Sequence, residues 1–139
     1  MKVEGPEIFT IDIKVNVGDI DQLGHVNNVV YIRYVQDAAV AHWNNRASQE
    51  EQNRYFWVVT RHEIDYKRPA FEGDEIIART WVGEAKNGLF ERFTELLRKS
   101  DKKQLVIAKT IWCPIDPKSM RPVEVNASVY AKFSINEKV

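Results

Sequence analysis

Residues 19–31, Asp-Ile-Asp-Gln-Leu-Gly-His-Val-Asn-Asn-Val-Val-Tyr, hold the side chains of this protein best suited to chemistry. Asp21 and His25 lie four residues apart, where a polar loop runs into an apolar segment that predicts a helix. A carboxylate, an imidazole and the free backbone N–H groups of a helix N-terminus are what attack on an activated carbonyl requires. The segment therefore predicts a site for reaction at an acyl group.

These residues also have structural interpretations. Asp21 could form an Asx turn, and Asn27 or Asn28 could cap the helix. His25 could orient Asp21 or simply hold the loop, and the two interpretations weigh equally. We interpret the neighbouring acid, Asp19, as a turn residue.

Composition narrows the class of protein. The chain has 139 residues, 44% of them hydrophobic, which suits one globular domain over residues 1–139. Twenty basic residues balance twenty acidic ones, which disfavours nucleic-acid binding. Cys113 is the only cysteine and the three histidines are scattered, so we expect no disulfide and no metal site. No secretory signal and no membrane-spanning run is found, which predicts a soluble cytoplasmic protein without membrane contact.

One long helix and several strands must position the loop. The helix is expected over residues 26–47 and is apolar around most of its circumference, as in a helix surrounded by protein. Strands are expected at 8–15, 56–67, 74–85, 89–98 and 105–114, with an Asn87-Gly88 hairpin turn; 123–133 fits either a helix or a strand. This order predicts an α+β domain whose sheet curls around the helix. Alternation places four apolar residues on the other face, where a partner subunit would cover them: Trp57, Val59, Ile77 and Trp81.

Three motifs resemble the hot-dog-fold proteins of the 4-hydroxybenzoyl-CoA thioesterase-like group. The first is residues 19–31. The second is Ile-Asp-Tyr-Lys-Arg-Pro-Ala at 64–70, followed by Gly73-Asp74, and the third is Pro-Ile-Asp-Pro at 114–117 with Arg121-Pro122. Together they cover nearly the whole chain in the expected order. The resemblance implies the hot-dog fold, in which a curved antiparallel sheet of about five strands wraps one long central helix.

The resemblance also implies an activity, hydrolysis of an acyl-CoA thioester with no cofactor beyond the coenzyme A of the substrate. It implies a homodimer or a dimer of dimers, with active sites at the subunit interface. In this group the second acid of the motif, here Asp21, acts as nucleophile or general base. The backbone N–H that binds the thioester oxygen falls near Asn28, and His25 and Asn27 support the loop.

Two alternative functions stay open. Acyl-carrier-protein (ACP) thioesterases resemble the same stretch, and a basic rim would favour that acidic partner. They place a functional Asn two residues before the His, where this chain has Leu23, so their mechanism does not carry over intact. The other alternative is a non-catalytic acyl-CoA-binding module, against which the presence of Asp21 argues.

Candidate substrate-binding residues lie further along the chain. Arg61, Lys67, Arg68 and Lys86 could bind the phosphates of coenzyme A, or could belong to a solvated strand edge. Tyr31, with Tyr34 and Phe90, could bound an acyl or aryl pocket. On a strand with apolar neighbours, His62 fits a structural role better than a substrate contact beside Thr60. The complete set of predicted substrate-binding residues is Asn27, Tyr31, Thr60, Arg61, His62, Lys67 and Arg68.

Overall fold

The computed structural model describes residues 5–138. Residues 1–4, part of the N-terminus where the sequence shows no secretory signal, and residue 139 lie outside the described range. A six-stranded sheet forms most of the molecule, and its main path runs β1-β3-β4-β5-β2 with β6 beside β3. All pairs are antiparallel except β3 with β6. The strands are β1 (Phe9–Lys14), β2 (Phe56–Tyr66), β3 (Glu75–Lys86), β4 (Leu89–Arg98), β5 (Gln104–Ile115) and β6 (Asn136–Glu137).

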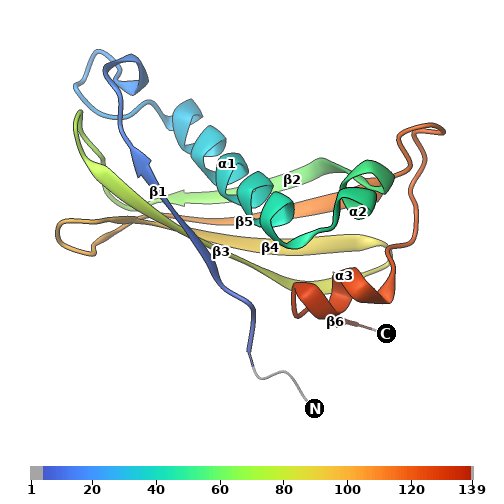
Figure 1. Cartoon of the computed structure of the whole chain (residues 1–139). Helices are drawn as coiled ribbons and strands as arrows, with labels where there is room; N and C mark the ends of the chain where they lie inside the picture. The colour runs from blue at the N-terminus through green and yellow to red at the C-terminus, as the bar shows by residue number, and fades with distance from the viewer. Residues whose placement is uncertain (1–4, 139) are drawn as a thin grey trace.

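A long helix, α1, lies across one face of this sheet (Figure 1). Its buried side includes Tyr34, Val35 and Ala38, which pack in one core cluster with sheet residues such as Ile76 and Leu96. This arrangement of one long helix on a curved antiparallel sheet is the hot-dog fold, and the predicted fold class is confirmed. The other helical elements are η1 (Val17–Asp19), α2 (Gln49–Arg54) and α3 (Ala127–Lys132), beside α1 (Asn28–Arg46).

The helix boundaries differ from expectation in instructive ways. α1 begins two residues later than predicted, because the extended Val26 donates its N–H to the carbonyl oxygen of Ala70 (2.9 Å). The segment 123–133, which fitted either a helix or a strand, contains the helix α3. α2 was not predicted, although Ser48 and Glu51 form a capping box that the sequence already shows. Among residues 5–138 no helix is long and apolar enough to cross a membrane.

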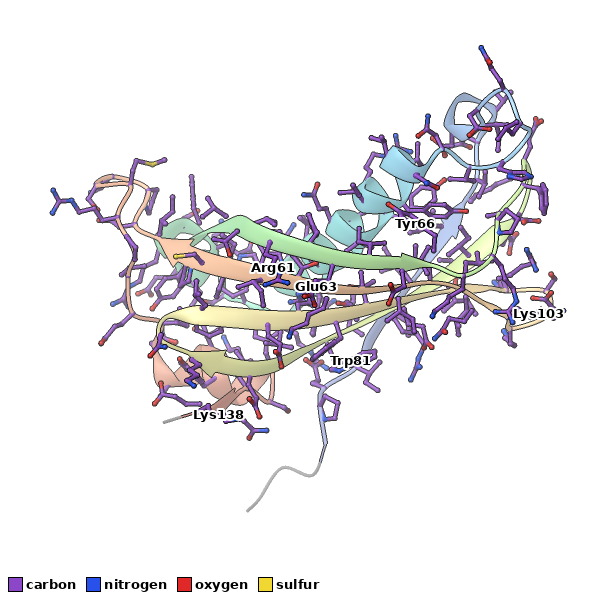
Figure 2. The ribbon with its side chains drawn as sticks, turned by 180° about the vertical axis from the view of Figure 1, so that it is seen from behind. Arg61, Glu63, Tyr66, Trp81, Lys103 and Lys138 are labelled. Carbon is purple, nitrogen blue, oxygen red and sulfur yellow. The ribbon has the colours of Figure 1, made fainter. Side chains whose placement is uncertain are left out.

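A β-bulge at Thr60 changes which side chains of β2 face the helix. β2 pairs with β5 in two registers, because Val59 lies opposite Trp112 whereas Arg61 lies opposite Ile111. The extra residue reverses the alternation. Trp57 and Val59 therefore face α1, and their predicted place on the uncovered face is wrong. Ile77 and Trp81 alternate with the buried positions of β3 and do lie on that face, where Figure 2 shows Trp81.

A buried polar network joins α1 to the sheet and the N-terminal segment. His42 is fully buried, stacks on Phe9, and shares hydrogen bonds with Glu7 (Nε2 to Oε2, 2.8 Å) and Arg92 (NH1 to Nδ1, 2.9 Å). Because Arg92 can only donate, Nδ1 accepts and Nε2 carries the proton that is donated to Glu7. Burial, with the positive charge of Arg92, lowers the pKa of His42 from 6.5 to about 4. His42 is thus neutral in the folded protein near pH 7.

We predict that the folded state loses stability as the pH falls from about 6.5 to about 4. In that window the unfolded chain binds a proton at this histidine and the folded chain does not, so protons favour unfolding. Urea denaturation at several pH values measures the slope. His42→Gln, which can still hydrogen-bond, should show a shallower dependence on pH, and equal slopes for the two proteins would contradict the assignment.

Candidate active site

The loop before α1 is folded tightly around Asp21. The Asp21 N–H donates to the carbonyl oxygen of His25 (2.8 Å), and Gly24 takes a left-handed φ of +80° that favours glycine. One carboxylate oxygen, Oδ1, accepts the Leu23 N–H (2.9 Å) in an Asx turn. The other, Oδ2, has no hydrogen-bond partner among the described residues. The structural and catalytic interpretations of Asp21 are therefore compatible, because one oxygen shapes the loop and the other is free.

The neighbouring acid, Asp19, has a different environment. It is only 5% exposed, and its carboxylate accepts from Arg33 (2.7 Å), the Tyr34 hydroxyl (2.7 Å) and the Asn16 N–H (3.2 Å). Burial by itself would raise the pKa of Asp19, but the hydrogen bonds from Tyr34 and Arg33 outweigh it and hold the pKa below its ordinary value. Asp19 is thus a structural carboxylate that ties the loop to α1.

The first turn of α1 leaves a backbone donor free. Asn27 is the N-cap: its Oδ1 accepts the Val29 N–H (3.0 Å), and its carbonyl oxygen accepts the Val30 N–H (2.9 Å). The N–H of Asn28 has no acceptor in the part of the chain that the structure describes. A free N–H at the positive end of a helix dipole suits an oxygen that gains negative charge.

His25 belongs to this loop, and its side chain points to a different partner from that of Asp21. Its half-buried ring meets Phe71 edge-on, with 5.2 Å between ring centroids. No hydrogen bond joins the ring to Asp21 within residues 5–138. In this conformation the ring packs against Phe71, as a residue that holds the loop would, and its catalytic role stays a prediction.

The tyrosines near the start of α1 hold the loop and the segment after β2 by hydrogen bonds. The Tyr31 hydroxyl accepts the Ala70 N–H (2.9 Å), and the Tyr34 hydroxyl donates to Asp19. The Tyr66 hydroxyl donates to the carbonyl oxygen of Asn28 (3.4 Å), and Figure 2 shows Tyr66 beside the first turn of α1. Together they fix the segment after β2 against the loop.

Only some of the predicted substrate-binding residues lie near this loop. Lys67 and Arg68 follow Tyr66 on the segment that borders it; both are exposed, and Arg68 donates to the carbonyl oxygen of Gln104 (2.8 Å). Thr60 and Arg61 lie near the middle of β2, several residues before Tyr66 and the segment that borders the loop. Arg61 pairs with Glu63 on the uncovered face (NH2 to Oε1, 2.5 Å; Figure 2).

His62 has a structural environment. It faces the helix side of the sheet beside Thr110, with 3.1 Å between Nδ1 and Oγ1, and burial lowers its pKa. The fold thus gathers Asp21, His25, Asn27 and Asn28, with Lys67 and Arg68 nearby. The functional roles of all the predicted site residues stay predictions.

A cavity of about 420 Å³ lies near the other end of α1, and sequence reasoning missed it. Its walls come from α1, α2, α3, β2, β3, β4 and β5, and of the three predicted pocket residues only Phe90 lines it. Along α1 the rise of about 1.5 Å per residue puts Trp43, in its wall, roughly 20 Å from Asn28. The many aromatic residues of the sequence were the available signal for this cavity. They did not suffice to predict it, because the bulge at Thr60 turns Trp57 toward the cavity wall.

Comparison with known proteins identifies the family. The family model of the thioesterase-like superfamily matches residues 15–133. The chain belongs to the thioesterase-like superfamily. Membership makes it a thioester hydrolase. No curated protein sequence matches the chain.

Solved structures of superfamily thioesterases show the same fold at low sequence identity. A 1,4-dihydroxy-2-naphthoyl-CoA thioesterase from Synechocystis is 17% identical, with a TM-score of 0.79 over 91% of this chain and 95% of that one. A Thermus thermophilus thioesterase complexed with coenzyme A and Zn is 21% identical, with a TM-score of 0.78 over 89% and 90%. An acyl-ACP thioesterase from Bacteroides thetaiotaomicron is 21% identical, with a TM-score of 0.79 over 94% of this chain and 54% of that one.

We predict that the two acids of the loop respond differently to amidation. Asp19→Asn removes a buried charge from three donors and should lower the free energy of unfolding by about 3 kcal/mol. Asp21→Asn keeps an oxygen for the Asx turn and should change it by less than about 1 kcal/mol. Urea denaturation of both variants measures this. Equal losses would show that Asp21 also has a structural role.

Proposed function

We propose that the protein hydrolyses an acyl-CoA thioester, with Asp21 as nucleophile or general base and the Asn28 N–H as oxyanion donor. The observation that carries the proposal is the start of α1, where a carboxylate oxygen and a backbone N–H both lack partners in the described structure. The superfamily assignment indicates thioester hydrolysis as the type of reaction. The free carboxylate oxygen and the free N–H are the groups that such a reaction needs.

The chemistry needs no further group. In one route the Asp21 carboxylate attacks the thioester carbonyl carbon, the C–S bond breaks, and coenzyme A leaves as a thiolate. Water then hydrolyses the resulting anhydride and restores the carboxylate. In the other route Asp21 takes a proton from a water molecule that attacks the carbonyl. Both routes place negative charge on the carbonyl oxygen, which the Asn28 N–H would stabilise.

The nucleotide end of the substrate would lie over exposed cations. Lys67 and Arg68 border the loop and reach solvent, and Lys67 forms no ion pair among the described residues. Arg donates to phosphate in a planar fork and Lys acts as a point charge. The same pair would also attract an acidic carrier protein, so acyl-ACP is the competing substrate.

A second copy of the chain would complete the site. Asp21 and the cavity lie at opposite ends of α1, and along the helix axis Asn28 and Trp43 are roughly 20 Å apart. β2 is an edge strand, and α1 exposes Val29 and Val40. Long unprotected edges and exposed apolar side chains are features that a partner covers. We therefore propose a homodimer in which the two β2 strands pair antiparallel.

Charge selects the register of this pairing. Centred on His62, the pairing sets Arg61 opposite Glu63 of the partner subunit, twice by symmetry. With Thr60 bulged out, Trp57 of the partner subunit then lies opposite Tyr66, whose hydroxyl contacts the first residue of α1. Each site would thus combine the loop of one subunit with the cavity of the other.

We predict that Asp21→Asn lowers kcat/KM for thioester hydrolysis by about a hundredfold or more, because the amide is neither a nucleophile nor a base. Thiol release is followed with short-chain, long-chain and aromatic acyl-CoAs, and with acyl-ACP. Full activity in Asp21→Asn would remove Asp21 from the mechanism. Binding of acyl-CoA without thiol release by the wild type would favour the binding-module alternative, and preference for acyl-ACP would reassign the carrier.

We predict that Glu63→Arg weakens the dimer at least tenfold, because it places like charges opposite each other across β2 at two positions. The control Arg61→Glu/Glu63→Arg exchanges the charges and should restore the wild-type dissociation constant. Sedimentation equilibrium measures both. A dimer unaffected by Glu63→Arg would exclude this register.

A further inference from the structure

The third motif of the sequence forms the end of β5 and a tight loop after it, residues 116–122, here called the β5 loop. The Asp116 N–H donates to the carbonyl oxygen of Arg121 (2.9 Å), and the Met120 N–H donates to that of Asp116 (2.7 Å). The Asp116 carboxylate accepts the Lys118 N–H (3.1 Å), so this acid shapes the loop. Hydrogen bonds within the β5 loop therefore hold it in one conformation.

The β5 loop carries two cations that have no acidic partner. Lys118 and Arg121 are exposed, and neither side chain forms an ion pair or a hydrogen bond among residues 5–138. Lys67 is likewise exposed and unpaired in that range, and Arg68 donates only to the carbonyl oxygen of Gln104. All four positive charges are thus available to an anion.

These two pairs of cations lie at opposite ends of one chain. β2 runs from Phe56, which pairs with Ile115 just before the β5 loop, to Tyr66, which precedes Lys67. Figure 2 shows Tyr66 toward one end of the sheet and the segment that follows β5 at the other. At about 3.3 Å per residue, the ends of β2 are roughly 30 Å apart. One nucleotide cannot contact both pairs within a single subunit.

The proposed dimer brings the two pairs together. In its register Trp57 lies opposite Tyr66 of the partner subunit, and the next pair sets Phe56 opposite Lys67 of the partner subunit. Phe56 also pairs with Ile115 of its own chain. Two strand spacings of about 4.8 Å therefore put Lys67 of the partner subunit about 10 Å from Ile115. Lys and Arg side chains extend several ångströms from the backbone, so they can meet in such a gap.

We propose that Lys118 and Arg121 of one subunit, with Lys67 and Arg68 of the partner subunit, form a clamp for the phosphate groups of the coenzyme A nucleotide. A guanidinium on each side can donate to phosphate in a fork, and an ammonium on each side adds a point charge. The clamp borders the loop with Asp21 of the partner subunit, and two-fold symmetry gives two clamps per dimer. The inference rests on the proposed function and on its dimer.

The size of the clamp favours a small ligand over an acidic carrier protein. Four cations would attract either one. A standard protein interface, however, covers roughly 800 Å² of each partner, whereas the gap between the two backbones is about 10 Å wide. Phosphate groups on one nucleotide can enter such a gap and contact cations on both sides.

The first test measures binding of adenosine 3′,5′-bisphosphate, with adenosine as the uncharged control, by calorimetry. The wild type should bind the bisphosphate, and Lys118→Ala/Arg121→Ala should raise its Kd about tenfold or more, because two charged contacts are lost. The matched control Lys14→Ala/Lys109→Ala removes the same charge from the far edge strand and the uncovered face, and should leave Kd unchanged.

Both variants change exposed side chains, and sedimentation checks that they remain dimers. Wild-type affinity in Lys118→Ala/Arg121→Ala would overturn the proposal. So would equal binding of adenosine and the bisphosphate, or no binding of the bisphosphate by the wild type.

The second test asks whether the clamp joins two subunits. Mixed dimers of Lys67→Ala/Arg68→Ala with Lys118→Ala/Arg121→Ala are isolated with two purification tags. If the clamp joins subunits, one clamp of the mixed dimer keeps all four cations and the other has none. We expect one bisphosphate per mixed dimer at the wild-type Kd, although each variant homodimer binds about tenfold more weakly. A mixed dimer without a tight site would overturn the proposal.

The third test separates the clamp from the proposed function. Thiol release is compared for an acyl-CoA and for the same acyl group on pantetheine, which lacks the nucleotide. Lys118→Ala/Arg121→Ala should raise KM for acyl-CoA about tenfold with little change in kcat, and should leave hydrolysis of acyl-pantetheine unchanged. An equal loss with both substrates would overturn the clamp.

The remaining outcomes distinguish the two proposals and the two carriers. Binding of the bisphosphate at the clamp without thiol release from any thioester would keep the clamp and overturn the proposed function. Acyl-CoA hydrolysis that is indifferent to Lys118→Ala/Arg121→Ala would do the reverse. A loss confined to acyl-ACP would assign these cations to the acidic carrier and overturn the nucleotide as their ligand.

Discussion

The docking of α1 on the concave face of the sheet is the constraint on which the rest of the structure depends. Small and aromatic residues of one helix face, such as Ala38 and Tyr34, pack into the core that the sheet forms. A helix fixed in this way must leave its first backbone N–H groups without intrahelical partners. Asn27 caps part of that end, and the Asn28 N–H is left over for a ligand.

Environment, rather than residue type, separates the two acids of the loop. Asp19 and Asp21 are two residues apart, yet one is enclosed by Tyr34, Arg33 and the Asn16 N–H, and the other retains a free oxygen. A carboxylate surrounded by donors has no oxygen left with which to attack a carbonyl. The buried acid therefore positions the loop, and the half-buried one keeps the free oxygen on which the proposed mechanism rests.

The two ends of α1 offer different chemistry. One end has a carboxylate and a free backbone N–H, and the other has a cavity with a largely aromatic wall. In a single chain the helix holds these two ends roughly 20 Å apart. The proposed dimer solves this geometrically, since antiparallel pairing of β2 would bring the cavity of one subunit to the loop of the other. Each site of the proposed dimer would then contain residues of both chains.

The sequence alone determined the fold class, the long helix, the principal strands and the loop with Asp21, since these follow from hydrophobic periodicity, turn residues and a local motif. Only the tertiary structure decided which side chains meet. One extra residue at Thr60 moved Trp57 from the uncovered face to the cavity wall, and partners distant in sequence made Asp19 structural. Arg92 gave no signal in the sequence, because its burial beside His42 depends on a helix and a strand fifty residues apart. Local pattern fixes periodic elements, whereas long-range packing assigns burial and hydrogen-bond partners, and with them the chemistry of each group.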